Sequence, residues 1–148
     1  MINLLKNILN NHNSLEEVND NKNLEQLCGL MIEAAYTDGQ IDKIEINKIR
    51  SSLVNVFTED QQEVNLAIDQ AIQNKNNSKS LHHYTSHINK NFDDNTKLLL
   101  IETLWEIVLS DGEVHDFESN LLRRLAGLLY ISDVSCGSAK KRALAKLQ

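Results

Sequence analysis

Apolar residues return every three or four positions along most of the chain, which is the spacing of one buried helix face. The pattern runs from Leu24 to a stop at Gly39, and it resumes over 42–56, 58–73, 81–92, 94–111 and roughly 116–130. A break at 132–138 precedes a last short helix that ends at Leu147. No segment alternates polar and apolar residues as a strand does. The sequence therefore predicts an all-α fold, a compact bundle of about seven or eight helices.

Two polar stretches, residues 14–23 and 74–80, separate the predicted parts of the chain. Residues 1–23 are predicted to form a short amphipathic helix and a linker, and residues 24–148 a single helical domain. The apolar side of the N-terminal segment could lie on a membrane or on the bundle itself, and the sequence leaves both open. The loop NKNNSKS at 74–80 divides the domain into two halves.

A ten-residue stretch occurs twice. Residues 36–45, YTDGQIDKIE, return in altered form at 109–118 as LSDGEVHDFE, and a shift of 73 positions aligns 33–50 with 106–123. The identical pairs are Glu33/Glu106, Asp38/Asp111, Gly39/Gly112, Glu45/Glu118, Asn47/Asn120 and Arg50/Arg123. This recurrence indicates an internal duplication, so we expect two related helical-hairpin halves. Packing about a pseudo-two-fold axis would bring the two corners into symmetric positions.

Both corners carry clustered carboxylates, the ligands that a hard cation such as Ca²⁺ or Mg²⁺ prefers. The candidate ligands are Asp38, Asp42 and Glu45 at the first corner, and Asp111 and Glu118 at the second. The same residues have a structural interpretation. Gly39 suits the left-handed position that ends a helix, and Asp42 can cap the next helix in a capping box with Glu45. The residues alone leave both interpretations open, and no other cofactor is expected.

Charge and hydropathy restrict the possible partners and location. A formal net charge of −6 argues against nucleic-acid binding, which needs clustered Lys and Arg. The basic tail Lys140, Lys141, Arg142 and Lys146 suits a solvated helix end or contact with an anionic surface. No apolar run approaches the roughly 18 residues of a transmembrane helix. Two cysteines without a CxxC motif fit a reducing cytosolic compartment, so we predict a cytoplasmic protein.

Catalytic chemistry lacks a candidate nucleophile. Neither Cys28 nor Cys136 has a base nearby in sequence, and no phosphate-binding loop occurs. His83 and His87 share a helix face at i, i+4 but have no third metal ligand close by. Tyr130 is predicted, with Trp105, to lie in the core. The sequence therefore predicts a protein that is not an enzyme.

The two corners, AAYTDGQIDKIEINKI and IVLSDGEVHDFESNLLRRLAGLLYIS, resemble the tellurite-resistance protein B (TerB) family. That family is related to the N-terminal helical domain of the membrane-tethered DjlA co-chaperone. The similarity covers roughly Leu24 to Leu147. It implies a helical fold in two related halves, a role in tellurite or metal-ion stress, and cation contact by the acidic corners. His115 departs from the family pattern because an acidic or small polar cap is usual there.

The sequence thus predicts a non-enzymatic stress-response protein that acts through a protein partner and binds a divalent cation at its corners. The main alternative is a structural interaction module whose acidic motifs only cap helices and which docks to a membrane-associated complex. A third is a small-molecule or metal-dependent hydrolytic site between the halves. The oligomeric state is left open.

Overall fold

The structure, a computed structural model, describes residues 22–36, 41–74, 80–111 and 116–147. In this part of the chain every regular element is a helix, short turns connect the helices, and there is no strand. A first helix spans 22–35. It is followed by α2 (Lys43–Asn55), α3 (Gln61–Gln73), α4 (Leu81–Asn91), α5 (Asp94–Val108), the short 3₁₀ helix η2 (Leu109–Asp111), α6 (Asp116–Leu128) and α7 (Asp133–Lys146). The prediction of a compact all-α bundle is confirmed, whereas the predicted N-terminal helix and linker lie outside the described residues.

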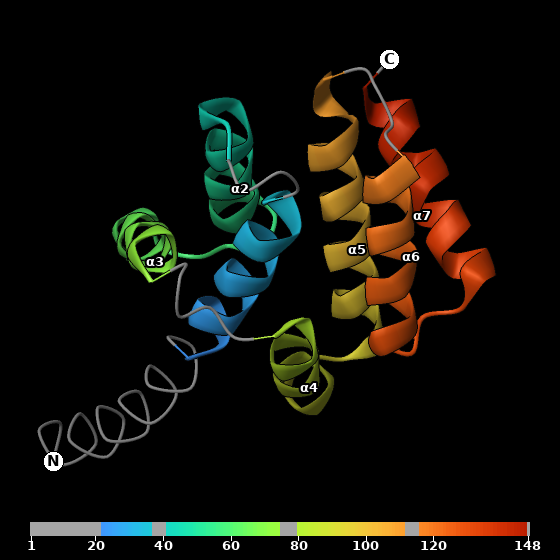
Figure 1. Cartoon of the computed structure of the whole chain (residues 1–148), viewed down its shortest axis with the longest axis horizontal. Coiled ribbons are helices and arrows are strands. Elements are labelled where there is room, and N and C mark those ends of the chain that lie inside the picture. The colour runs from blue at the N-terminus through green and yellow to red at the C-terminus, as the bar shows by residue number, and fades with distance from the viewer. Residues whose placement is uncertain (1–21, 37–40, 75–79, 112–115, 148) are drawn as a thin grey trace, which may run out of the picture.

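The bundle consists of two three-helix units joined by α4 (Figure 1). Adding 73 to the bounds of α2 gives those of α6, and adding 73 to 22–35 gives a range that overlaps α5. Adding 72 to the bounds of α3 gives 133–145, which lies within α7. The repeat therefore extends one helix beyond the predicted hairpin, and the turn before the third helix is one residue shorter in the second unit.

The turns before the third helix of each unit differ in length by one residue but share a residue with positive φ. Thr58 and Tyr130, which are equivalent at a shift of 72, are the non-glycine residues with positive φ, at 55° and 59°. In each turn the next amide reaches back to the helix end: Glu59 N donates to Leu53 O at 3.0 Å, and Ile131 N donates to Ala126 O at 2.8 Å. Both bonds satisfy a carbonyl near a helix C-terminus, and the one from Ile131 to Ala126 has the spacing of a Schellman motif.

The core is built from equivalent positions of the two units. Met31 and Leu104 are buried at equivalent places on the first helix and α5, and Ile49 and Leu122 are buried on α2 and α6. Among the labelled helices, α2 packs on α5, α4 packs on α6, and α7 packs along α5. No helix in the described ranges is long and apolar enough to cross a bilayer.

Two predictions about the second unit are wrong. Tyr130 is 85% exposed because it occupies the turn after α6, where its ring lies on the surface over Lys97 Nζ at 5.9 Å, whereas Trp105 is buried as predicted. The predicted break at 132–138 is instead the start of α7. Ser132 caps this helix by accepting a hydrogen bond from Ser135 N at 3.1 Å, which allows helix to begin within a polar, glycine-containing segment.

Candidate functional site

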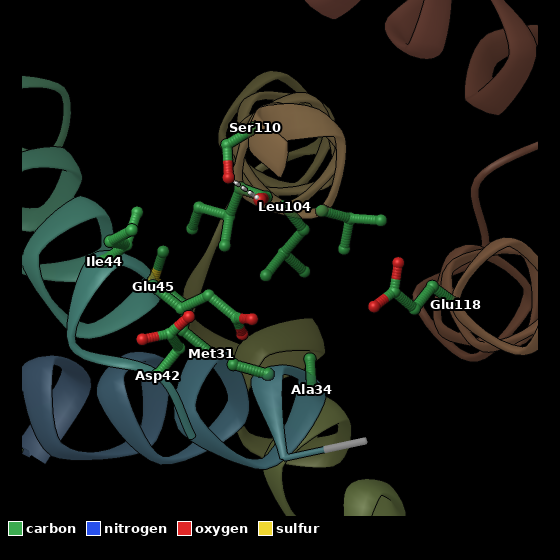
Figure 2. A pocket seen from close by; sticks show the side chains of 11 residues that line it. Met31, Ala34, Asp42, Ile44, Glu45, Leu104, Ser110 and Glu118 are labelled. Carbon is green, nitrogen blue, oxygen red and sulfur yellow. Dashed lines mark hydrogen bonds between the residues drawn. The ribbon is translucent and has the colours of Figure 1, made fainter. Parts of the chain in front are cut away.

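The two corners open onto one cavity of about 120 Å³. The first helix and the start of α2 form one side of this corner pocket, and α5, η2 and the start of α6 form the other (Figure 2). Its lining residues are Met31, Ala34, Ala35, Asp42, Ile44, Glu45, Leu104, Ile107, Val108, Ser110 and Glu118.

Most of the lining consists of repeat-equivalent pairs. At the shift of 73 the pairs are Met31/Leu104, Ala34/Ile107, Ala35/Val108 and Glu45/Glu118. Each unit therefore contributes the same four positions to the same cavity, as a local two-fold axis through the pocket requires. The structure therefore brings equivalent positions of the two corners to one cavity, while the two-fold relation itself stays a prediction.

Carboxylates from both corners reach the corner pocket. In Figure 2, Glu45 extends into the cavity from α2 and Glu118 faces it from α6 on the opposite side. Asp42 lies beside Glu45 at the start of α2. The rest of the pocket wall is mostly apolar and is formed by side chains such as Met31 and Leu104. A charge interacts more strongly with carboxylates beside an apolar wall than with the same groups on an open surface.

Asp42 does not cap α2 in the predicted way. Its backbone is at the N-cap position, with φ −80° and ψ 149°, and its carbonyl accepts from Ile46 N at 3.0 Å. Its side chain, however, makes no capping hydrogen bond. By contrast, Asp60 at the start of α3 accepts from Gln62 N and Glu63 N, both at 3.1 Å. The capping interpretation therefore does not account for the Asp42 carboxylate.

Two of the predicted ligands are not tested by the structure. Asp38 lies outside the described residues, and Asp111 ends η2 with a side chain that is not described. The structure thus brings together Asp42, Glu45 and Glu118 around one cavity. Within the ranges it describes, no three His, Cys, Asp or Glu side chains converge closely enough to hold a metal ion.

The corner pocket also contains residues that the sequence did not single out. Ser110 lies on its rim and donates from Oγ to Ile107 O at 2.6 Å, which leaves hydroxyl lone pairs as acceptors. The apolar wall residues were treated only as core. Applying the shift of 73 to the buried helix faces, and not to the polar motif alone, would have paired them.

A second group of charges holds α7 against the end of α5. Lys146 Nζ lies 3.2 Å from Glu102 Oε1 and 2.9 Å from Glu106 Oε1, and Arg142 Nε lies 3.2 Å from Glu102 Oε2. The hydrogen bonds to Glu106 and Glu102 raise the pKa of Lys146 above its ordinary value. Glu106 is one of the repeated acidic residues, and this pairing assigns it to helix packing.

The described cysteines are both buried thiols. Burial raises the pKa of Cys28 to about 12, so at neutral pH it stays protonated. A thiol in that state is a poor nucleophile and a poor metal ligand.

Comparison with known proteins finds a matching family and a similar solved structure. The profile of the family described as "Tellurite resistance protein TerB" matches residues 24–141. A crystal structure of a protein of unknown function from Porphyromonas gingivalis W83 has a similar fold, with a TM-score of 0.63 and 19% sequence identity. That alignment covers 84% of this chain and 95% of the other. No match was found among curated proteins.

Proposed function

Because the chain belongs to the tellurite resistance protein TerB family, we propose that it is a non-enzymatic protein of metal or chemical stress response that binds one divalent cation between its corners. The observation that carries this proposal is the shared corner pocket, into which Glu45 and Glu118 project from equivalent positions. Two separate corner sites would not require the corners to meet. A single pocket on the local two-fold axis lets both acidic motifs serve one ion.

The proposed ligands are Asp42, Glu45 and Glu118 together with Asp38 and Asp111. Oxygen ligands without cysteine suit Ca²⁺ or Mg²⁺, which take six to eight and six ligands respectively. Carboxylates, the Ser110 hydroxyl and water can supply that number. The uncapped side chain of Asp42 supports its inclusion, because a helix-capping role would leave it fewer free lone pairs.

An ion shared by the corners would link the two three-helix units. Its binding would stabilise one relative arrangement of the units, and through that arrangement it would control contact with a protein partner in the cytoplasm. In this way, ion binding in the corner pocket would act in a stress response.

Calorimetric titration with Ca²⁺, Mg²⁺, Mn²⁺ and Zn²⁺ tests the proposal. We expect one ion per chain, and an affinity at least about tenfold lower in Glu45→Gln and in Glu118→Gln, which corresponds to about 1.4 kcal/mol. Asp38→Asn and Asp111→Asn should weaken binding in the same way. Glu63→Gln, an exposed acid on α3, is the matched control and should bind normally.

Three results would count against the shared site. No heat from any ion removes the cation role and favours the interaction module. Two ions per chain, of which Glu118→Gln abolishes only one, would mean that the corners act separately. Unchanged affinity in both glutamine variants would place the ion elsewhere.

A further inference from the structure

The third helices of the two units carry opposite charge. Helix α3, Gln61–Gln73, has two acidic residues, Glu63 and Asp69, and no Lys or Arg. Between 131 and 147 the sequence has four basic residues and one acidic residue, Asp133. Figure 1 shows α3 and α7 at opposite ends of the long axis of the molecule. Duplication has thus left equivalent helices of opposite charge at the two ends.

Each of these helices also exposes apolar side chains on its charged face. On α3, Leu66 is 62% exposed, with the exposed acids Glu63 and Asp69 three residues before and after it. On α7, Val134 is 80% exposed and Leu144 is 41% exposed. A helical repeat of three and four places these two residues in one stripe with Gly137 and Lys141.

Gly137 leaves a gap in the stripe on α7. A Cβ at Gly137 would meet no atom within 4 Å, so nothing inside the chain requires a glycine there, although glycine is a poor helix former. An exposed Leu66 from a facing helix fits the gap that Gly137 leaves between Val134 and Lys141. Acids three residues from Leu66 would then lie about 4.5 Å along the axis, and Lys141 lies about 6 Å along α7 from Gly137.

The basic residues of α7 are not equally available. Arg142 and Lys146 are paired with Glu102 and Glu106 on α5, and the Lys140 ammonium lies over the Trp105 ring at 5.1 Å. Lys141 is exposed and makes no such contact with the described residues. Lys141 is therefore the basic residue of α7 that is best placed to pair with an acidic side chain of another molecule.

We infer that α3 of one copy of this chain docks on α7 of a second copy through Leu66 and the acids beside it on one side, and Val134, Gly137, Lys141 and Leu144 on the other. A second copy is the occupant that the charges favour, because the same chain carries both complementary faces. Since the faces lie at opposite ends, the contact is head-to-tail and does not close after two copies.

Sedimentation velocity on the full chain in EDTA tests the inference independently of the cation site. We expect the average mass to rise with concentration from about 10 μM to about 1 mM, beyond that of a dimer. It should fall again as salt shortens the screening length from about 10 Å at 0.1 M to about 3 Å at 1 M. A mass that stays monomeric throughout overturns the inference.

Single charge reversals identify the faces. Asp69→Lys on α3 and Lys141→Glu on α7 should each abolish self-association. The matched reversals Glu25→Lys and Lys43→Glu, at exposed positions outside both stripes, should leave it unchanged. Leu66→Ser should also abolish it, and thermal unfolding confirms that each variant is folded.

Mixing the two defective variants is the decisive step. Asp69→Lys retains a wild-type α7 face, and Lys141→Glu retains a wild-type α3 face. An equimolar mixture should therefore associate again, because the two wild-type faces can pair and the two reversed faces also carry opposite charges. Failure of the mixture to associate, or association in either variant alone, would overturn the head-to-tail contact.

Discussion

Glu45 and Glu118, 73 positions apart in sequence, face the same cavity from opposite sides (Figure 2). Each follows the corner of its own three-helix unit, and each is accompanied by apolar wall residues that are also repeat equivalents. A duplicated motif has therefore produced one composite pocket. Neither unit alone would contain it.

Gly29 allows the first helix to approach α4 closely, so we predict that Gly29→Ala destabilises the fold. An added Cβ would lie 2.6 Å from Tyr84 Cε1 and 2.9 Å from Cζ, which forces a shift in a packed region. Overpacking of this kind costs about 1–3 kcal/mol in the free energy of unfolding, measurable by urea denaturation.

The control is Gly127→Ala on α6, where the new methyl group meets nothing within 4 Å. It should raise the free energy of unfolding by about 0.5–1 kcal/mol, through helix propensity alone. Equal effects at the two positions would show that the contact between Gly29 and Tyr84 has no energetic weight.

Tyr130 is held in a left-handed conformation that disfavours its side chain, so we predict that Tyr130→Gly stabilises the protein. The conformation costs a non-glycine residue about 1–2 kcal/mol, and glycine's greater freedom in the unfolded chain cancels part of this gain. Tyr130 is 85% exposed, so little apolar packing is lost, but the cation–π contact of its ring with Lys97 Nζ, 5.9 Å from the ring centre, is removed and offsets part of the gain. A net gain of about 0.5–1 kcal/mol is expected from thermal or urea unfolding.

Thr58→Gly should behave like Tyr130→Gly, because the two turns are equivalent. Tyr130→Ala provides the contrast, since alanine keeps the unfavourable φ and should bring no gain. Stabilisation by alanine as well as by glycine would mean that the tyrosine side chain, and not the backbone, is the source of the effect.

The fold was largely predictable from the sequence, whereas the full extent of the repeat was not. The motif around Asp38 and Asp111 is visible at a constant shift of 73. The shift falls to 72 at the third helices, where Val64 and Cys136 are both buried, half-buried Ala67 matches buried Ala139, and the sequences no longer look alike. A search at one fixed shift loses the repeat at that turn.

Only part of the candidate site was predictable: Asp42, Glu45 and Glu118 line the corner pocket, but its other lining residues and its geometry were not foreseen. Periodicity shows that Met31 and Leu104 are buried, but it cannot show that the two helix ends meet at one cavity. The Asp42 side chain can point towards its own helix or away from it. Which rotamer it adopts depends on tertiary contacts, and the sequence does not show these. For the same reason Tyr130 was assigned to the core: its spacing continues the α6 pattern, and only the turn geometry moves it outside.

We predict that His87 lowers the free energy of unfolding at acidic pH. Desolvation is the main cause that lowers the pKa of His87 below its ordinary value near 6.5, with Lys22, His83 and Lys90 adding repulsion and Glu25 opposing them. Since the folded pKa is the lower one, the unfolded chain binds the proton more readily. The contribution of His87 is therefore complete above about pH 6.5 and is lost as the pH falls through its folded pKa.

Urea denaturation between about pH 7.5 and pH 5 measures this dependence. In His87→Gln, which can retain the hydrogen bond that His87 Nε2 shares with Asn23 Oδ1 at 2.9 Å, the fall in stability over this range should be smaller. An identical pH dependence in the variant would exclude His87 as its source.

The central claim is that both corners serve one ion, and anomalous diffraction from crystals grown with Mn²⁺ tests it most directly. Mn²⁺ accepts the same oxygen ligands as Mg²⁺ and Ca²⁺ and can be located by its own scattering. We predict one peak per chain in the corner pocket, at about 2.0–2.6 Å from carboxylate oxygens of both Glu45 and Glu118. A peak that touches only one corner, or an empty pocket at saturating Mn²⁺, would contradict the claim.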